Sequence, residues 1–361
     1  MDITREELVD VLQSIPARAQ VLVCGHTRPD GDSMGSVLAL VAALRLRDID
    51  ARPLLADNAT PPAPYLWMAG VDDFTTPEEL AQDYQADFFI ALDTPDPKRM
   101  AEALPLLQEA TQSLIIDHHP PLPESYADLR FADITSAATG ELVWSLLCQL
   151  GWQLNADIAT ACYVATLSDT GSFQFSNTTK TTFAHVSEMI DAGAVPADAA
   201  LKLYSQKPLA ALHLEGRVLS RAKLLNGGAV IHSYLSDADL HEFGVPIDYT
   251  ENLIDLIRSV RDTDAAVFIT ESSKGPRVSL RSDGRFDVSA AARAFGGGGH
   301  RPAAGITWPD KAASIEQILD ALLPHLPHFA TDSADLEAQE TDREWKLVEA
   351  DEDASDQTLI I

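Results

Sequence analysis

Short β-rich runs alternate with helical stretches through the first half of this 361-residue chain, and this alternation limits the fold more than any other feature. The strongest runs are QVLVCG at 20–25, DFFIALD at 87–93 and SLIID at 113–117, and a helix is predicted from about Asp32 to Leu46. Such alternation is typical of a parallel sheet. The runs are apolar without a period of two, as expected for strands covered on both faces. We therefore predict an α/β fold: a parallel-sheet N-terminal domain with helices on both faces.

A smaller α/β domain is predicted in the second half, where helical patterns and β-runs again alternate. The helical pattern of the first half stops at Gly193, and a new helix is predicted from about Leu209. We expect four parts: a catalytic domain over 1–192, a linker over 193–207, a substrate-binding domain over 208–328 and an acidic tail over 329–361. The tail has little apolar periodicity, so we predict that it is disordered, with a partner-binding segment as the alternative.

The charge balance excludes one class of partner. Lys and Arg number 26 against 55 Asp and Glu, a net charge of −29 that repels phosphate backbones and disfavours tight binding to long nucleic acid. The N-terminus is acidic, and no apolar run approaches the roughly 18 residues of a membrane span, so we expect a cytoplasmic protein with no membrane partner. The three cysteines form no CxxC pair, which disfavours disulfides and thiolate zinc sites.

Each strong β-run of the first half leads into Asp or His. His26 follows the first run, Asp93 ends the second, and Asp117, His118 and His119 end the third. In an open α/β sheet, the carboxyl ends of the strands form the edge at which ligands bind. We expect these side chains to converge there.

We predict that this edge of the sheet holds a metal centre. The string HTRPDGDS places His26, Asp30 and Asp32 in one short loop, and Asp169 ends a later helical run. Carboxylate and imidazole donors without thiolate suit Mn²⁺ or Mg²⁺ better than Zn²⁺. Together with Asp93, the three aspartates bring four negative charges, which two divalent cations cancel. A two-metal centre also activates water at neutral pH.

In their order along the chain, these motifs and the late GGGGH at 296–300 resemble the DHH phosphoesterase family with its DHH-associated C-terminal domain. The resemblance spans about residues 15 to 325. It implies two Mn²⁺ ions, with Mg²⁺ or another divalent metal as the alternative. The implied ligands of one ion are His26, Asp30 and Asp93, and those of the other are Asp32, Asp93, His118 and Asp169.

The resemblance also implies roles for the other two residues of the Asp-His-His triplet. His119 is expected to face the scissile phosphate. Asp117 is expected to orient a ligand imidazole. A simple strand-end cap is the alternative for Asp117.

An anion-holding region is predicted in the second domain. Between 271 and 305, six Lys and Arg stand against three Asp and Glu, and four consecutive glycines allow backbone N–H groups to approach a phosphate. In the resembling family, this glycine loop and an arginine-serine pair hold the end of the substrate. Arg99, six residues after Asp93, is expected to be a further phosphate contact, with a solvated helix start as the alternative. The expected substrate contacts are Arg99, Arg281, Ser282, Gly297, Gly298, Gly299, His300 and Arg301.

Within the family, the chain resembles the small nanoRNase and 3′-phosphoadenosine 5′-phosphate (pAp) phosphatase group. It shows no additional oligonucleotide-binding domain or basic groove, as an exonuclease of the RecJ type would need. We expect a manganese-dependent phosphoesterase that hydrolyses very short RNAs to 5′-mononucleotides, pAp to AMP and phosphate, or both. The alternatives are a linear or cyclic dinucleotide phosphodiesterase and a catalytically inactive nucleotide-binding module. The oligomeric state stays open, with a homodimer as one option.

Overall fold

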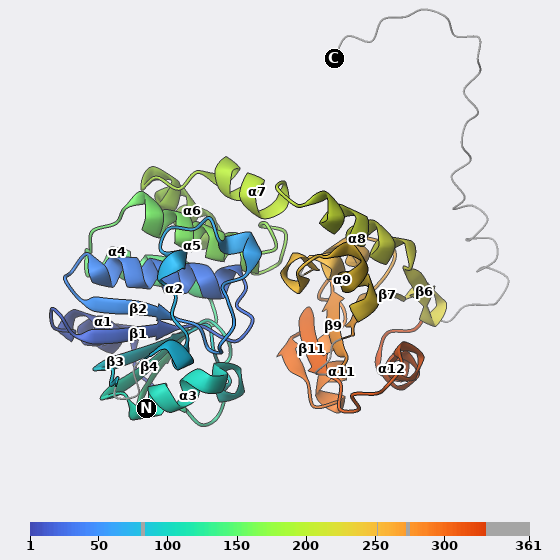
Figure 1. The fold of residues 1–361 in the computed structure, drawn as a ribbon, viewed down its shortest axis with the longest axis horizontal. Helices are drawn as coiled ribbons and strands as arrows, with labels where there is room; N and C mark the ends of the chain where they lie inside the picture. The colour runs from blue at the N-terminus through green and yellow to red at the C-terminus, as the bar shows by residue number, and fades with distance from the viewer. Residues whose placement is uncertain (81–83, 251, 272–274, 330–361) are drawn as a thin grey trace, which may run out of the picture. The chain divides into compact units, whose positions relative to one another are not determined.

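The computed structural model describes residues 1–80, 84–250, 252–271 and 275–329 (Figure 1). The chain divides into two compact units, one up to Lys207 and one from Pro208. The expected linker over 193–207 contains helix α7 (Pro196–Tyr204), which contacts α5 of the first unit. Apart from Phe329, the expected tail lies outside the described residues.

The first unit contains a five-stranded parallel sheet in the order β2-β1-β3-β4-β5, which confirms the predicted sheet (Figure 1). Both faces of the central strands are apolar: along β1, every residue from Val21 to Cys24 is buried. The sequence analysis did not predict β5. The strands are β1 (Gln20–Cys24), β2 (Asp50–Leu54), β3 (Phe88–Leu92), β4 (Gln112–Asp117) and β5 (Leu129–Ala132).

Helices cover both faces of this sheet. One apolar cluster includes residues of α1, α2, α4, α5 and α6, and a second cluster on the other face includes Leu107 of α3. Helices α2 and α5 pack closely because residue 35 is glycine: a Cβ there would lie 2.3 Å from the carbonyl oxygen of Ala161. This contact fixes α2 beside α5, which ends at Asp169. The helices are α1 (Arg5–Ser14), α2 (Gly31–Arg45), α3 (Leu104–Glu109), α4 (Thr139–Leu150), α5 (Ala156–Asp169) and α6 (Lys180–Asp191).

The second unit has a six-stranded sheet in the order β10-β11-β9-β8-β7-β6, in which only β7 and β8 run parallel. Its strands are β6 (Lys223–Leu225), β7 (Val230–Leu235), β8 (Ala265–Thr270), β9 (Arg277–Ser282), β10 (Gly298–His300) and β11 (Ala303–Thr307). Its helices are α8 (Leu209–Ser220), α9 (Asp237–Phe243), α10 (Leu253–Arg258), α11 (Val288–Ala294) and α12 (Ile315–Leu322). Helices α11 and α12 pack on one face, and α8 and α10 pack on the other.

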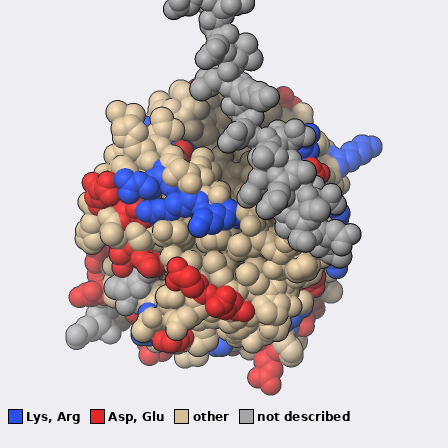
Figure 2. Space-filling model, turned by 90° about the vertical axis from the view of Figure 1, so that its right-hand side faces the viewer, with Lys and Arg blue, Asp and Glu red and all other residues tan. Residues whose placement is uncertain are grey.

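The surface of the second unit mixes the two signs of charge. On the face that Figure 2 shows, Lys and Arg side chains form a short row with Asp and Glu side chains near it. Among the described residues, no helix is both long and apolar enough to cross a membrane.

Candidate metal centre

All six expected metal ligands come together at the carboxyl edge of the first sheet. β1, β3 and β4 are neighbours in the sheet, so the residues that follow them meet at this edge. The start of α2 adds Asp30 and Asp32, and Asp169 is the last residue of α5. His26, Asp32, Asp93 and His118 are buried.

The expected ligands form two sets, and Asp93 belongs to the first and lies near His118 of the second; Asp93 also groups with Asp117, His118 and His119. In the first set, His26 Nε2 lies 3.7 Å from Asp30 Oδ2 and 3.4 Å from Asp93 Oδ2. The other carboxylate oxygen of Asp93 belongs to the second set, 3.7 Å from His118 Nε2. These separations exceed ordinary hydrogen-bond lengths and suit donors placed around a common cation.

The second set is completed by Asp32 and Asp169. Their carboxylate oxygens lie 3.7 Å and 3.4 Å from His118 Nε2. Asp93 therefore lies between the two sets, with one carboxylate oxygen facing each of them.

Backbone carbonyls orient the two imidazoles. His26 Nδ1 lies 3.0 Å from the carbonyl oxygen of Thr27, and His118 Nδ1 lies 3.3 Å from that of Ser136. In metal sites, a hydrogen bond from one ring nitrogen to a carbonyl commonly fixes the tautomer in which the other nitrogen binds the metal. The donor sets therefore fit divalent cations.

Asp93 adopts a left-handed backbone conformation, with φ of 55°. This region is uncommon for residues other than glycine, and such strain persists where the surrounding structure holds it. Here the Asp93 N–H donates to the carbonyl oxygen of Ile116 on β4, over 3.2 Å. The chain thus turns sharply at the end of β3 and directs this carboxylate into the centre.

The crowding of carboxylates changes their pKa values. Burial, together with Asp93 and Asp169, raises the pKa of Asp32 well above its usual value, and burial raises the pKa of Asp169 to about 6. Burial opposes the charge of His26, but Asp30 and Asp93 raise its pKa to about 9. Bound divalent cations would relieve this repulsion between buried carboxylates.

Asp117 contacts His119. Its Oδ1 accepts one hydrogen bond from the His119 backbone N–H and one from His119 Nδ1, each 2.8 Å long. Burial opposes the charge of His119, but these contacts with Asp117 and a contact with Asp93 raise its pKa to about 11. From the sequence, Asp117 is expected to orient a metal-ligand imidazole; in the structure it bonds instead to His119, the other histidine of the triplet.

Arg99 lies beside the first donor set. It belongs to the 3₁₀ helix over Pro97–Ala103, and its carbonyl oxygen accepts a hydrogen bond from Thr27 N–H over 2.8 Å. Its positive charge opposes protonation of His26. Within the described part of the chain, the Arg99 guanidinium makes no hydrogen bond or ion pair. This cation is therefore available to an anionic ligand.

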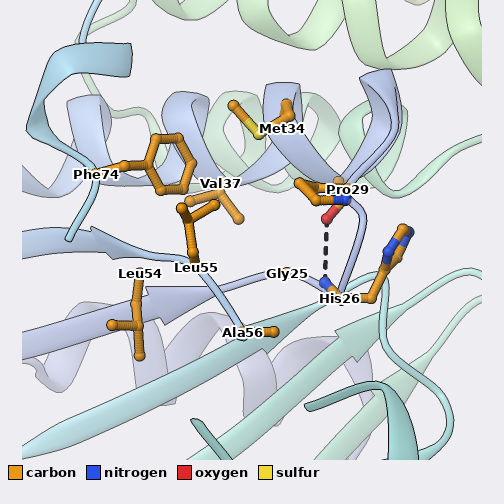
Figure 3. A pocket seen from close by; sticks show the side chains of 10 residues that line it. Gly25, His26, Pro29, Met34, Val37, Leu54, Leu55, Ala56 and Phe74 are labelled. Carbon is orange, nitrogen blue, oxygen red and sulfur yellow. Dashed lines mark hydrogen bonds between the residues drawn. The ribbon is translucent and has the colours of Figure 1, made fainter. Parts of the chain in front are cut away.

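An apolar wall supports the loop that carries the first donors (Figure 3). Figure 3 shows Met34, Val37, Leu55 and Phe74 around a small pocket, with the His26 ring turned away from them. The His26 N–H donates to the Ser33 hydroxyl over 3.2 Å. The loop is thus packed on one side and polar on the side of the donor sets.

The expected contacts of the second unit do not share one face. Along β9, residues alternate between buried and more exposed, and Arg281 is half-buried while Ser282 is buried. Arg281 Nε lies 3.9 Å from Asp255 Oδ1 on α10. The Ser282 hydroxyl instead donates to the Phe286 carbonyl oxygen over 2.7 Å. Of Arg281 and Ser282, only Arg281 has a side chain exposed enough to contact a ligand.

The glycine-rich segment is partly a strand. A loop is expected here from the sequence, but Gly298–His300 pairs with β11 at the sheet edge. Gly297 donates its N–H to the Ala292 carbonyl oxygen, and a Cβ at Gly299 would lie 2.4 Å from the Ala303 carbonyl oxygen. A Cβ at Gly298 would meet open space.

The two remaining expected substrate contacts, His300 and Arg301, lie at the end of β10. Arg301 donates to the carbonyl oxygens of Gly284 and Arg285, over 2.7 and 2.9 Å. It therefore ties the turn after β9 to β10. The side chain of His300 lies outside the described part of the structure.

Three residues that no sequence motif indicated hold the second donor set. Thr139 and Gly140 donate backbone N–H groups to Asp32, and Asn177 donates to the Asp169 carbonyl oxygen. The one sequence signal was Glu141, the only charged residue in the helical run over 139–150.

Comparison with known proteins identifies the family. Residues 20–166 match the N-terminal domain of the DHH family, and residues 227–324 match the DHHA1 domain. The bifunctional oligoribonuclease and PAP phosphatase NrnA of Thermus thermophilus is 30% identical over 321 residues, covering 88% of this chain and 93% of that protein. The chain belongs to the DHH family. It is a phosphoesterase, and the acidic and imidazole side chains at the edge of its first sheet form groups that could hold a metal ion.

Two further relatives extend over most of this DHH-family chain. The NrnA of Bacillus subtilis is 26% identical over 319 residues, covering 87% of this chain and 97% of that protein. The crystal structure of an exopolyphosphatase-related protein from Bacteroides fragilis has a TM-score of 0.79 at 24% identity, covering 88% of this chain and 95% of that one. The similarity to the Bacteroides fragilis structure shows that the two proteins share a fold.

Proposed function

We propose that this DHH-family phosphoesterase is manganese-dependent and hydrolyses very short RNAs to 5′-mononucleotides, pAp to AMP and phosphate, or both. The observation that carries this proposal is Asp93, whose two carboxylate oxygens face two separate sets of donors. The relatives named NrnA, described as bifunctional oligoribonuclease and PAP phosphatase, support the same substrates.

The proposed ligands are divided between two Mn²⁺ ions, with Asp93 shared. When bound, such ions would neutralise phosphate charge and lower the pKa of a water molecule. The first set is His26, Asp30 and Asp93, and the second set is Asp32, Asp93, His118 and Asp169.

The other residues of this edge bind and orient the substrate. Arg99 offers a guanidinium to a phosphate oxygen. His119, held by Asp117, presents its ring to the scissile phosphate and donates a hydrogen bond to an oxygen on which negative charge develops.

The second unit supplies the contacts that select a short substrate. Arg281 binds the terminal phosphate, and the open backbone around Gly298 approaches it together with His300. Gly297, Gly299 and Arg301 shape the strand and turn that present these groups. Ser282 holds the turn after β9.

A turnover panel tests the proposal. Purified protein is incubated with pAp, linear dinucleotides, a cyclic dinucleotide and RNAs of two to ten nucleotides, with Mn²⁺ and with EDTA, and Asp93→Ala is the control. We expect Mn²⁺-dependent release of 5′-mononucleotides from the shortest RNAs, of phosphate from pAp, or both. Turnover of the cyclic dinucleotide alone would establish the dinucleotide phosphodiesterase alternative. Binding without turnover of any substrate would establish an inactive nucleotide-binding module.

A further inference from the structure

One short segment touches two of the three side chains that, with Asp93, make up the second donor set. The carbonyl oxygen of Ser136 orients His118 through its Nδ1. Three residues further on, Thr139 N–H donates to Asp32 Oδ2 over 2.7 Å and Gly140 N–H donates to Asp32 Oδ1 over 2.8 Å. Asp32 therefore accepts from the first turn of α4, where backbone N–H groups lack partners within the helix.

The same segment is linked by hydrogen bonds to Asp169, the third of these residues. Asn177 Nδ2 donates to the Ala137 carbonyl oxygen over 2.9 Å and to the Asp169 carbonyl oxygen over 3.0 Å. The Thr139 hydroxyl also donates to Asp93 Oδ1, the oxygen that faces this set. Residues 136–140 are therefore a common support for the second set.

Glu141 stabilises residues 136–140 through a hydrogen bond to Ala137. Its side chain is buried, and Oε2 accepts from Ala137 N–H over 2.9 Å and from the Thr182 hydroxyl over 3.2 Å. The other oxygen, Oε1, lies 2.9 Å from His185 Nδ1 on α6. The residue before α4, Ala138, has no side-chain cap, so Glu141 and Asp32 satisfy N–H groups at this end of the helix.

A buried carboxylate is costly unless it is paired, and an apolar residue could fill this position in the core. Glu141 does not touch a donor of either set; it acts through Ala137. The first set, in contrast, is oriented by Thr27 on the loop after β1 and by Ser33 in the first turn of α2.

We propose that Glu141, braced by His185, is a positioning residue for the second donor set alone: it fixes residues 136–140 and through them His118, Asp32 and Asp169. This inference rests on the proposed two-cation function. It predicts that loss of Glu141 weakens one of two metal sites and spares the other.

The experiment measures Mn²⁺ binding to metal-stripped full-length protein by titration calorimetry, with metal content counted after dialysis. Glu141→Leu is compared with Glu188→Leu. Glu188 is a matched control because it also joins α6 to α4, by accepting a hydrogen bond from Trp144 Nε1 over 3.0 Å, and no hydrogen bond joins it to residues 136–140 in the described structure. We expect Glu141→Leu to weaken one Mn²⁺ site by about 10- to 100-fold, the usual effect of removing an outer-shell partner. Glu188→Leu should bind both ions as the wild type does.

Two further variants separate positioning from general stability. Glu141→Gln keeps an acceptor for Ala137 N–H and should restore most of the lost affinity. Asn177→Ala removes the link to Asp169 at a half-buried position outside the helices, and it should weaken the same site if Glu141→Leu fails to fold. Thermal unfolding in EDTA monitors the fold of each variant.

The outcomes distinguish the inference from the function on which it rests. If the wild type binds two Mn²⁺ ions and both Glu141→Leu and Asn177→Ala bind them as tightly as Glu188→Leu does, the positioning role is overturned and the proposed function stands. Equal weakening of both sites also overturns it. A wild type that binds no Mn²⁺ overturns both proposals.

Discussion

Asp117 Oδ1 accepts two hydrogen bonds from His119, one from the backbone N–H and one from the ring, each 2.8 Å long. The two bonds close a tight turn after β4 and fix the imidazole relative to the strand. Since Nδ1 donates to Asp117, Nε2 lies on the opposite side of the ring.

This relationship predicts the effect of Asp117→Asn. The asparagine can still accept one bond, but it removes the negative charge that holds the protonated ring, so kcat on a short substrate should fall by about 10- to 100-fold while metal content stays unchanged. His118→Ala should lower both, because His118 belongs to a donor set. Loss of metal from Asp117→Asn, counted after dialysis, would show that Asp117 acts on a ligand.

The shared position of Asp93 predicts a different pattern of metal loss. Asp93→Ala removes a donor from both sets and should abolish binding of both ions together with nearly all activity. Asp30→Ala removes a donor from the first set only and should leave one ion bound. The metal content of the two purified variants tests this difference. An Asp93→Ala protein that keeps two ions and normal turnover would contradict the dinuclear centre.

The parts of this site that the sequence predicted are those set by local order along the chain. His26, Asp93 and Asp117 follow apolar β-runs, and parallel pairing of adjacent strands brings such positions to one edge. The alternation of strands and helices likewise predicted the parallel sheet and its helices on both faces.

What the sequence could not predict depends on contacts between distant segments. Gly298–His300 becomes a strand only because β11 follows and pairs with it, and glycine has a low intrinsic preference for strands. Asn177 and Glu141 act through backbone groups of residue 137, which no pattern of side chains reveals. Burial of Ser282 follows from the register of β9.

An ion pair of the second unit predicts an acid-sensitive contribution to stability. Hydrogen bonds from Arg221 lower the pKa of Asp239 on α9, although burial opposes this. Because the folded pKa is lower than the unfolded value of 3.8, the stabilisation is present above about pH 4 and is lost as the pH falls below it. Asp239→Asn should lower the free energy of unfolding by about 1–3 kcal/mol at pH 7 and by less at pH 3, measured by urea unfolding. An equal loss at both pH values would assign the effect to packing.

The last prediction concerns Arg281, the expected contact that stays half-exposed on β9. Asp255 lies 3.9 Å from its Nε, beyond hydrogen-bond distance, so the guanidinium keeps donors for a phosphate. Arg281→Ala should reduce kcat/KM on a dinucleotide by about 10- to 1000-fold, the cost of one or two charge-assisted contacts.

Arg285→Ala is the matched control, because it removes the same charge from the same unit at a residue already paired with Asp264 over 2.9 Å. It should leave dinucleotide turnover unchanged. Both variants should keep their metals and the hydrolysis of bis-p-nitrophenyl phosphate, a small diester with no terminal phosphate for Arg281 to hold. If Arg281→Ala loses the small-diester activity as well, the arginine supports the metal centre or the fold and does not bind the end of the substrate. If the wild-type protein degrades a 24-mer RNA at the rate of a dinucleotide, the second unit does not limit substrate length, and the net charge of −29 does not exclude long strands either.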